Sequence, residues 1–167
     1  SYNAVEKRIT WSVLVNYART GLLNASIKDA ILPGQTYVDG SLKIYPYTIR
    51  SNGSTVKGTE LTPEQMAKFD IDLPGEGNNQ TLTVGFPDGD NLYWIEFDTS
   101  VSGTVIAATY DNTAILHNEA ETSGDISLSA KVSVKHGGSL VEKSGIQDAD
   151  GYASWNLTVN PANSTLS

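Results

Sequence analysis

The stretch Ile9-Thr-Trp-Ser-Val-Leu-Val-Asn16 is the most informative part of this 167-residue chain, because a close copy of it, Ala153-Ser-Trp-Asn-Leu-Thr-Val-Asn160, returns near the other end. Trp155 follows Trp11 by 144 positions (155 − 11). A repeat of that length is too long for a solenoid unit and matches one complete domain. We therefore expect one domain over residues 1–138 and, over residues 139–167, the opening strands of the next repeat of a tandem array.

Hydrophobic residues alternate with others within the first copy of the repeat, which predicts a half-buried strand. Similar runs, separated by turns rich in Gly, Pro and Asn, cover residues 25–29, 41–47, 80–86, 92–101, 104–117, 126–135 and 152–160. Thr62-Pro-Glu-Gln65 supplies an N-cap, a proline at the first helical position and a capping-box glutamine, so it predicts one short helix. Many short strands with turns between them indicate an all-β sandwich. The expected core is Trp11, Val13, Val15, Ile27, Ile95, Phe97 and Ile115.

Composition and charge restrict the classes of function. The chain has 11 Lys and Arg against 19 Asp and Glu, a net charge of −8, which repels phosphate backbones. We expect no nucleic-acid partner and, without a long apolar run, no membrane insertion. The chain has no cysteine, and His117 and His136 have no acidic partner at ligand spacing, so we expect no metal site. No nucleophile elbow or phosphate loop is present, so we expect no cofactor and no enzymatic activity.

Several of these segments resemble the collagen-binding-type domain of Gram-positive cell-wall adhesins. The resemblance lies in Trp11-Ser-Val-Leu-Val-Asn16, Asn24-Ala-Ser-Ile-Lys-Asp29, Gly40-Ser-Leu-Lys-Ile-Tyr45, Tyr93-Trp-Ile-Glu-Phe-Asp-Thr99 and Asp111-Asn-Thr-Ala-Ile-Leu116, and it extends over about residues 5–136. It implies an immunoglobulin-like sandwich on a surface protein. It does not specify a ligand, because such domains serve both as matrix binders and as stalk spacers.

The resemblance also implies a spontaneous Lys–Asn isopeptide bond promoted by a buried acid. Asp29 matches the acid and Asn112 the acceptor, so we expect the two side chains to meet in the core. A neutral lysine amine attacks the carboxamide, and burial favours both the neutral amine and the protonated acid. The alternative for Asp29 is a strand end that caps a turn, and Asn112 after Asp111 also fits ordinary turn chemistry.

The lysine is the point at which this sequence departs from the family pattern. The reactive lysine of the family lies about a dozen residues before the strand tryptophan, which here falls just before Ser1, so we expect domain 1–138 to lack its first strand. Lys143 lies twelve residues before Trp155, at the place expected for the next repeat or for a reaction with another copy. Lys7 is a weaker alternative that lies closer to Trp11 than the pattern requires.

The leading hypothesis is a non-enzymatic adhesin or stalk domain that is extracellular, anchored to the cell wall and mechanically robust. Its expected partners are a host matrix protein such as collagen, neighbouring repeats and, by strand exchange, another copy of the chain. One alternative is a strand-swapping assembly module, in which residues 140–143 of another chain fill an open sheet edge. Another is a carbohydrate-binding module, which requires Tyr45, Tyr47 and Tyr93 on one solvent face. We also expect residues 139–167 to dock on the first domain, because two strands alone are marginal in water.

Overall fold

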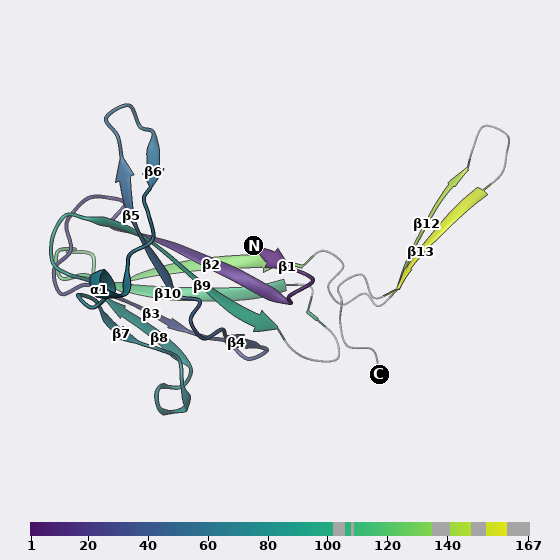
Figure 1. The fold of residues 1–167 in the computed structure, drawn as a ribbon, viewed down its shortest axis with the longest axis horizontal. Coiled ribbons are helices and arrows are strands. Elements are labelled where there is room, and N and C mark those ends of the chain that lie inside the picture. The colour runs from purple at the N-terminus through teal and green to yellow at the C-terminus, as the bar shows by residue number, and fades with distance from the viewer. Residues whose placement is uncertain (102–105, 108, 135–140, 148–152, 160–167) are drawn as a thin grey trace.

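The computed structural model describes the whole chain except residues 102–105, 108, 135–140, 148–152 and 160–167. Its strands form two antiparallel sheets that pack face to face, and a separate hairpin (Figure 1). The first sheet contains, in order, β1 (Tyr2–Asn3), β2 (Arg8–Val15), β9 (Leu92–Val101), β5 (Lys43–Ile49) and β6 (Thr55–Lys57), and β4 (Gln35–Tyr37) also pairs with β9. The second contains β11 (Ile126–Ser133), β10 (Thr109–His117), β3 (Ser26–Ala30), β8 (Thr81–Gly85) and β7 (Asp70–Asp72). The predicted all-β, immunoglobulin-like class is confirmed.

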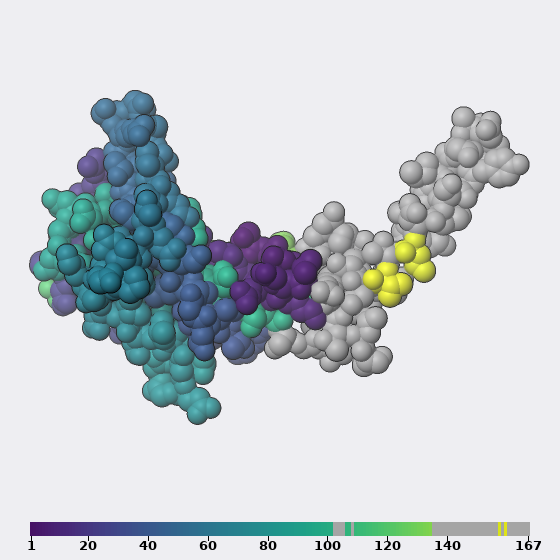
Figure 2. Space-filling model, viewed as in Figure 1, coloured from purple at the N-terminus to yellow at the C-terminus, as the bar shows by residue number. Residues whose placement is uncertain are grey.

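Two short helical segments lie between strands. The predicted helix is α1 (Pro63–Met66), and both hydrogen bonds of the capping box are formed: Gln65 N donates to Thr62 Oγ1 and Thr62 N donates to Gln65 Oε1. These bonds satisfy backbone groups that the short helix leaves open at its start. A 3-10 turn, η1 (Glu76–Asn78), precedes β8. Figure 2 shows the β5–β6 hairpin, in blue, projecting from the body of the sandwich.

The core lies between the two sheets and follows the alternation of the strands. In β9, buried residues alternate with partly exposed ones from Tyr93 onward, as period-2 patterning requires. Of the expected core residues, Trp11, Val15, Ile27, Ile95 and Phe97 are at most 3% exposed, and Val13 packs against them half-buried. The expectation for Ile115 was wrong, because this side chain is 44% exposed. Its strand β10 turns Tyr110, Asn112, Ala114 and Leu116 inward instead.

Strand β2 has a free edge. On one side it pairs with β9 along its whole length, from Arg8 to Val15. On the other side β1 reaches only Arg8 and Ile9, and Ser1 adds two hydrogen bonds with Thr10, of 2.8 and 2.9 Å. From Trp11 to Val15, no described strand pairs with this edge. Among the described residues, the outward backbone groups of this part of β2 therefore have no strand partner.

The C-terminal segment forms a hairpin of β12 (Val141–Gln147) and β13 (Ala153–Val159). Neither strand joins a sheet of the sandwich (Figure 1), and Leu157 and Val159 on β13 are exposed. The docking expected for this segment is therefore not seen as strand pairing with the described domain.

Candidate functional site

Asp29 and Asn112 meet in the core, as expected. Strand β3 buries Ile27 and Asp29 on one face, and it pairs with β10 so that Asp29 lies opposite Ala114, one inward position from Asn112. Asn112 Nδ2 donates to Asp29 Oδ2 at 2.6 Å. The exposed fractions of the two residues are 0% for Asp29 and 5% for Asn112. The alternative, in which Asp29 ends a strand and its side chain caps the following turn, does not fit the structure, because the side chain lies inside the sandwich and contacts Asn112.

The environment of Asp29 raises its pKa from 3.8 to about 6, because burial penalises the charged carboxylate. The hydrogen bond from Asn112 acts in the opposite direction and lowers the pKa, but by less. Asp29 Oδ1 is buried and has no hydrogen-bond partner among the described residues. The observed bond runs from the amide to the carboxylate, which suits the ionised acid. The expected bond from a protonated acid to the amide oxygen requires the Asn112 amide to rotate by half a turn.

A cleft of about 160 Å³ opens beside this pair, between the free edge of β2 and the second sheet. Its walls come from three strands: residues 11–14 of β2, Asn112 and Ala114 of β10, and residues 128–130 of β11. Asn112 therefore has its acid partner in the core and also borders a groove at the open sheet edge. A strand placed along that edge would lie next to the acceptor carboxamide.

The structure places the two candidate lysines differently. Lys7 lies in the turn before β2, with a left-handed backbone (φ 52°), and it does not line the cleft. Strand β2 begins only at Arg8, so Lys7 lies outside its alternation. Lys143 lies on β12, opposite Leu157 of β13. No lysine among the described residues lines the cleft.

A second candidate site lies on the outer face of the first sheet. Tyr45 and Trp94 are cross-strand neighbours, and the Tyr47 ring stacks on Trp94 with centroids 5.8 Å apart. Lys57 Nζ lies 4.0 Å from the Tyr45 ring centroid and forms an ion pair with Glu96, which also accepts from Trp94 Nε1 at 2.7 Å. These contacts lower the pKa of Glu96, against the opposing effect of its partial burial. We call these five residues the aromatic cluster.

A groove of about 370 Å³ borders the aromatic cluster, and its wall includes Glu96 together with Arg8, Thr10, Val38, Asp39, Gly40, Ser41, Lys43 and Asp98. The aromatic row expected for a carbohydrate-binding module is absent, because Tyr93 is only 7% exposed and packs inward against Phe69 and Phe86. Trp94, which is not one of the three expected aromatic residues, lies on the outer face instead of Tyr93. The alternation of β9 is the signal that identifies it, because Tyr93, Ile95 and Phe97 all point inward.

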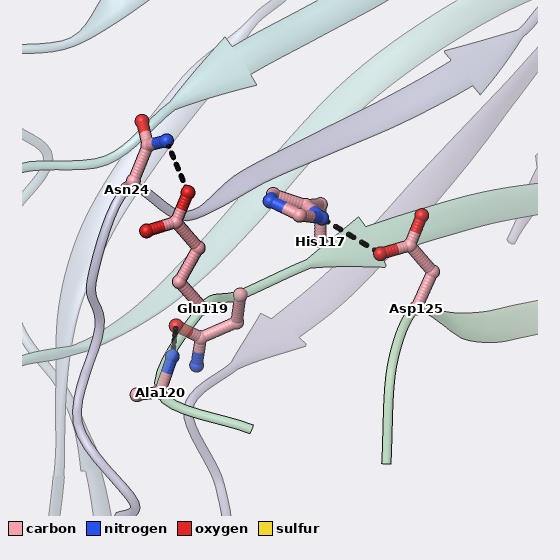
Figure 3. Close-up of polar contacts among 6 residues, drawn as sticks. Asn24, His117, Glu119, Ala120 and Asp125 are labelled. Carbon is pink, nitrogen blue, oxygen red and sulfur yellow. Dashed lines mark hydrogen bonds and ion pairs between the residues drawn. The ribbon is translucent and has the colours of Figure 1, made fainter. Parts of the chain in front are cut away.

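Polar contacts close the end of the sandwich near the β10–β11 hairpin. Asn24 Nδ2 donates to Glu119 Oε1 at 2.8 Å, and His117 Nδ1 lies 2.7 Å from Asp125 Oδ1 (Figure 3). The sequence analysis found no acidic partner at ligand spacing for His117, and the hairpin brings Asp125, eight positions further along the chain, beside it. Both side chains are about half exposed, so the pair contributes little to stability. Within the described part of the chain, no group of three potential metal-binding side chains occurs, and no helix is long and apolar enough to cross a membrane.

Comparison with known proteins identifies the family. A family model for the collagen binding domain matches residues 1–126. The chain therefore belongs to the collagen-binding domain family, as its sequence motifs indicated. A comparison with curated protein sequences gave no match.

Solved structures share the fold at low sequence identity. One is the collagen-binding domain of a Staphylococcus aureus adhesin, with 17% identity, a TM-score of 0.55 and coverage of 77% of this chain and 89% of that one. Another is the collagen-binding subdomain of the Enterococcus faecalis surface protein ACE, with 14% identity, a TM-score of 0.54 and coverage of 75% and 85%. A third is the collagen-binding domain of the Erysipelothrix rhusiopathiae surface protein RspB, with 15% identity, a TM-score of 0.57 and coverage of 92% and 45%.

Proposed function

We propose that this chain is a non-enzymatic adhesin module of a Gram-positive surface protein, displayed outside the cell and anchored to the wall, that binds a collagen-like triple helix. The family supports the class of ligand. The observation that carries the proposal is the groove on the outer face of the first sheet, with the aromatic cluster at its border.

The chemistry of collagen suits this face. Its chains are polyproline II helices rich in proline, and aromatic-lined grooves are a common way to recognise such chains. Tyr45, Tyr47 and Trp94 supply partly exposed rings, held in place by their mutual contacts and by Lys57 and Glu96. The charged groove residues, of both signs, supply partners for the polar side chains and carbonyl groups of a triple helix.

Trp94→Ala should weaken binding to immobilised triple-helical collagen by about tenfold or more, because a central aromatic anchor contributes at least 1 to 2 kcal/mol. Surface plasmon resonance on native collagen and on heat-denatured collagen would measure this. Tyr17→Ala is the matched control, since Tyr17 is an aromatic residue that is 64% exposed and neither lines the groove nor belongs to the aromatic cluster. Equal binding by both variants, or no preference for the native triple helix, would contradict the assignment.

A second candidate function is covalent reinforcement, which the buried Asp29–Asn112 pair supports. In this reaction a neutral lysine Nζ attacks Asn112 Cγ, an amide bond forms, and the carboxamide nitrogen leaves as ammonia. Asp29, with its pKa raised to about 6, gives a proton to the carboxamide oxygen of Asn112 and then takes one from the attacking lysine nitrogen. It passes that proton to the carboxamide nitrogen, which leaves as ammonia, and it recovers its own proton from the oxygen as the new amide carbonyl forms. In a tandem array, Lys143 would serve the following repeat in the same way.

The crosslink can be tested with a peptide of residues 139–147, which carries Lys143, added to the whole chain. Intact mass spectrometry should show an adduct whose mass is the sum of the two minus one ammonia. Asp29→Ala should slow the reaction by orders of magnitude while the circular dichroism stays that of a β-sandwich, and Asn112→Ala should abolish it. The same peptide with Lys143→Arg keeps the strand and removes the nucleophile. A peptide that binds without mass loss would contradict the crosslink.

A further inference from the structure

A hollow of about 390 Å³ lies at one end of the sandwich, between β5, the segment around α1 and the start of β9 (Figure 1). It shares no wall residue with the groove of the proposed function or with the cleft beside Asn112. Tyr47, which also belongs to the aromatic cluster, is the residue that connects the two faces. A hollow of this size is within the range of roughly 300 to 1,000 Å³ that is typical of sites for small ligands.

The floor of the hollow is apolar and firmly packed. Leu92 and Tyr93 of β9 are only 6% and 7% exposed. The Tyr93 ring stacks on Phe86 with centroids 5.6 Å apart, and the Phe69 ring meets it edge-on at 5.1 Å. Further apolar walls come from Pro46, Leu61 and Pro87. An apolar ring of a ligand can therefore pack here against side chains that are already held in place.

The polar part of the wall offers hydrogen-bond donors. The side-chain oxygen of Gln65 accepts from Thr62 N at 2.9 Å, so its NH₂ group is the part available to a ligand. Lys68 also lines the hollow, and an ammonium group can only donate. Asn91 Nδ2 lies 3.4 Å from the Tyr93 hydroxyl, which places a third donor at the wall. A ligand that fits these groups must present acceptors.

The charge of the hollow restricts the ligand further. Among the described residues that line it, Lys68 is the only charged one, and it forms no ion pair with another described residue. Aromatic walls could hold a cation, but here Lys68 would repel it and no carboxylate of the wall would compensate. The net charge of −8 disfavours a polyanion. The best match is a ligand with one negative charge.

From these features we propose that the hollow binds a proline-rich segment of a single polypeptide chain that carries one Asp or Glu side chain. Proline has an apolar ring and a carbonyl acceptor but no backbone donor, so it matches an apolar floor beside a wall of donors. Polyproline II segments are recognised in aromatic-lined grooves elsewhere. The carboxylate would lie beside Lys68. This site is separate from the proposed collagen site, and it takes one chain instead of a triple helix.

Two peptides with the proline run and a glutamate at either end, acetyl-Pro-Pro-Pro-Pro-Glu-amide and acetyl-Glu-Pro-Pro-Pro-Pro-amide, would test the proposal on the whole chain. In a titration followed by two-dimensional proton–nitrogen NMR, at least one should shift the amide signals of Gln65, Lys68, Phe69 and Tyr93. Replacing its glutamate with glutamine should weaken binding by about threefold to fivefold, the range for an exposed ion pair. Replacing its prolines with alanine should weaken binding more, because the rings that pack on the floor are lost.

Lys68→Gln should remove the preference for glutamate over glutamine and leave the affinity for the glutamine peptide unchanged. Lys28→Gln is the matched control, since Lys28 is an exposed lysine on β3 that does not line the hollow, and it should keep the preference. Lys68→Gln should also bind immobilised collagen as the parent does, which separates this site from the proposed function. The proposal would be overturned if neither peptide bound at several millimolar, if the shifted signals lay elsewhere, or if Lys68→Gln kept the preference for glutamate.

Discussion

Trp11→Ala should lower the free energy of unfolding by about 3 to 5 kcal/mol, the range for removing a large buried aromatic side chain. Trp11 is 3% exposed and lies in the middle of β2, where it packs against the core. Its indole nitrogen also donates to Thr99 Oγ1 at 2.9 Å and to Gln35 Oε1 at 3.2 Å. Alanine leaves a cavity and removes the shared donor from Thr99, which is 1% exposed.

Denaturant titration followed by far-ultraviolet circular dichroism would measure this loss without relying on tryptophan fluorescence. The matched control is Ile115→Ala, a deletion in β10 at a side chain that is 44% exposed. Its cost should be about 1 kcal/mol or less, the span of strand propensities. A Trp11→Ala loss as small as that of Ile115→Ala would show that Trp11 does not anchor the core.

Alternation was the sequence signal that predicted most of the fold, and the failure at Ile115 shows its limit. Asn112 and Ile115 differ by an odd number of positions, so a regular strand cannot turn both inward. The hydrophobic side chain of Ile115 led to the expectation that it points inward. In the structure Asn112 points inward and bonds to Asp29, so Ile115 points outward. The strands of two or three residues, β1, β4, β6 and β7, were not predicted, since so short a segment has no readable period.

For the candidate sites too, one part could be predicted from the sequence and another part depends on how the strands pair. The motif resemblance predicted that Asp29 and Asn112 meet, although they are 83 positions apart (112 − 29). The cleft beside them depends on which strands pair, and no local segment of the sequence specifies strand pairing. Similarly, the aromatic cluster joins β5, β6 and β9, so only the assembled sheet brings Lys57 over Tyr45.

Asp29 should make the domain less stable as pH rises from about 4 to above 6. The unfolded chain releases this proton near the ordinary pKa of 3.8, whereas the folded chain keeps it up to a pKa of about 6. Between these values the folded state binds more protons, so a rise in pH favours unfolding. The contribution of Asp29 is fully present below about pH 4 and is lost through pH 6. At 1.36 kcal/mol per unit, the loss amounts to about 3 kcal/mol.

Asp29→Asn isolates this effect, because it keeps the shape and an acceptor for Asn112 but cannot ionise. The free energy of unfolding of the variant should nearly equal that of the parent at pH 4 and exceed it by about 3 kcal/mol at pH 8. Asp70→Asn, which removes an exposed carboxylate on β7, supplies the comparison for losing one negative charge from a chain of net charge −8. Denaturant titrations at pH 4, 6 and 8 would measure the difference. If Asp29→Asn were no more stable than the parent at pH 8, burial of the charged carboxylate would not lower the free energy of unfolding. The physical basis for the role of Asp29 as a proton donor to Asn112 would then be lost.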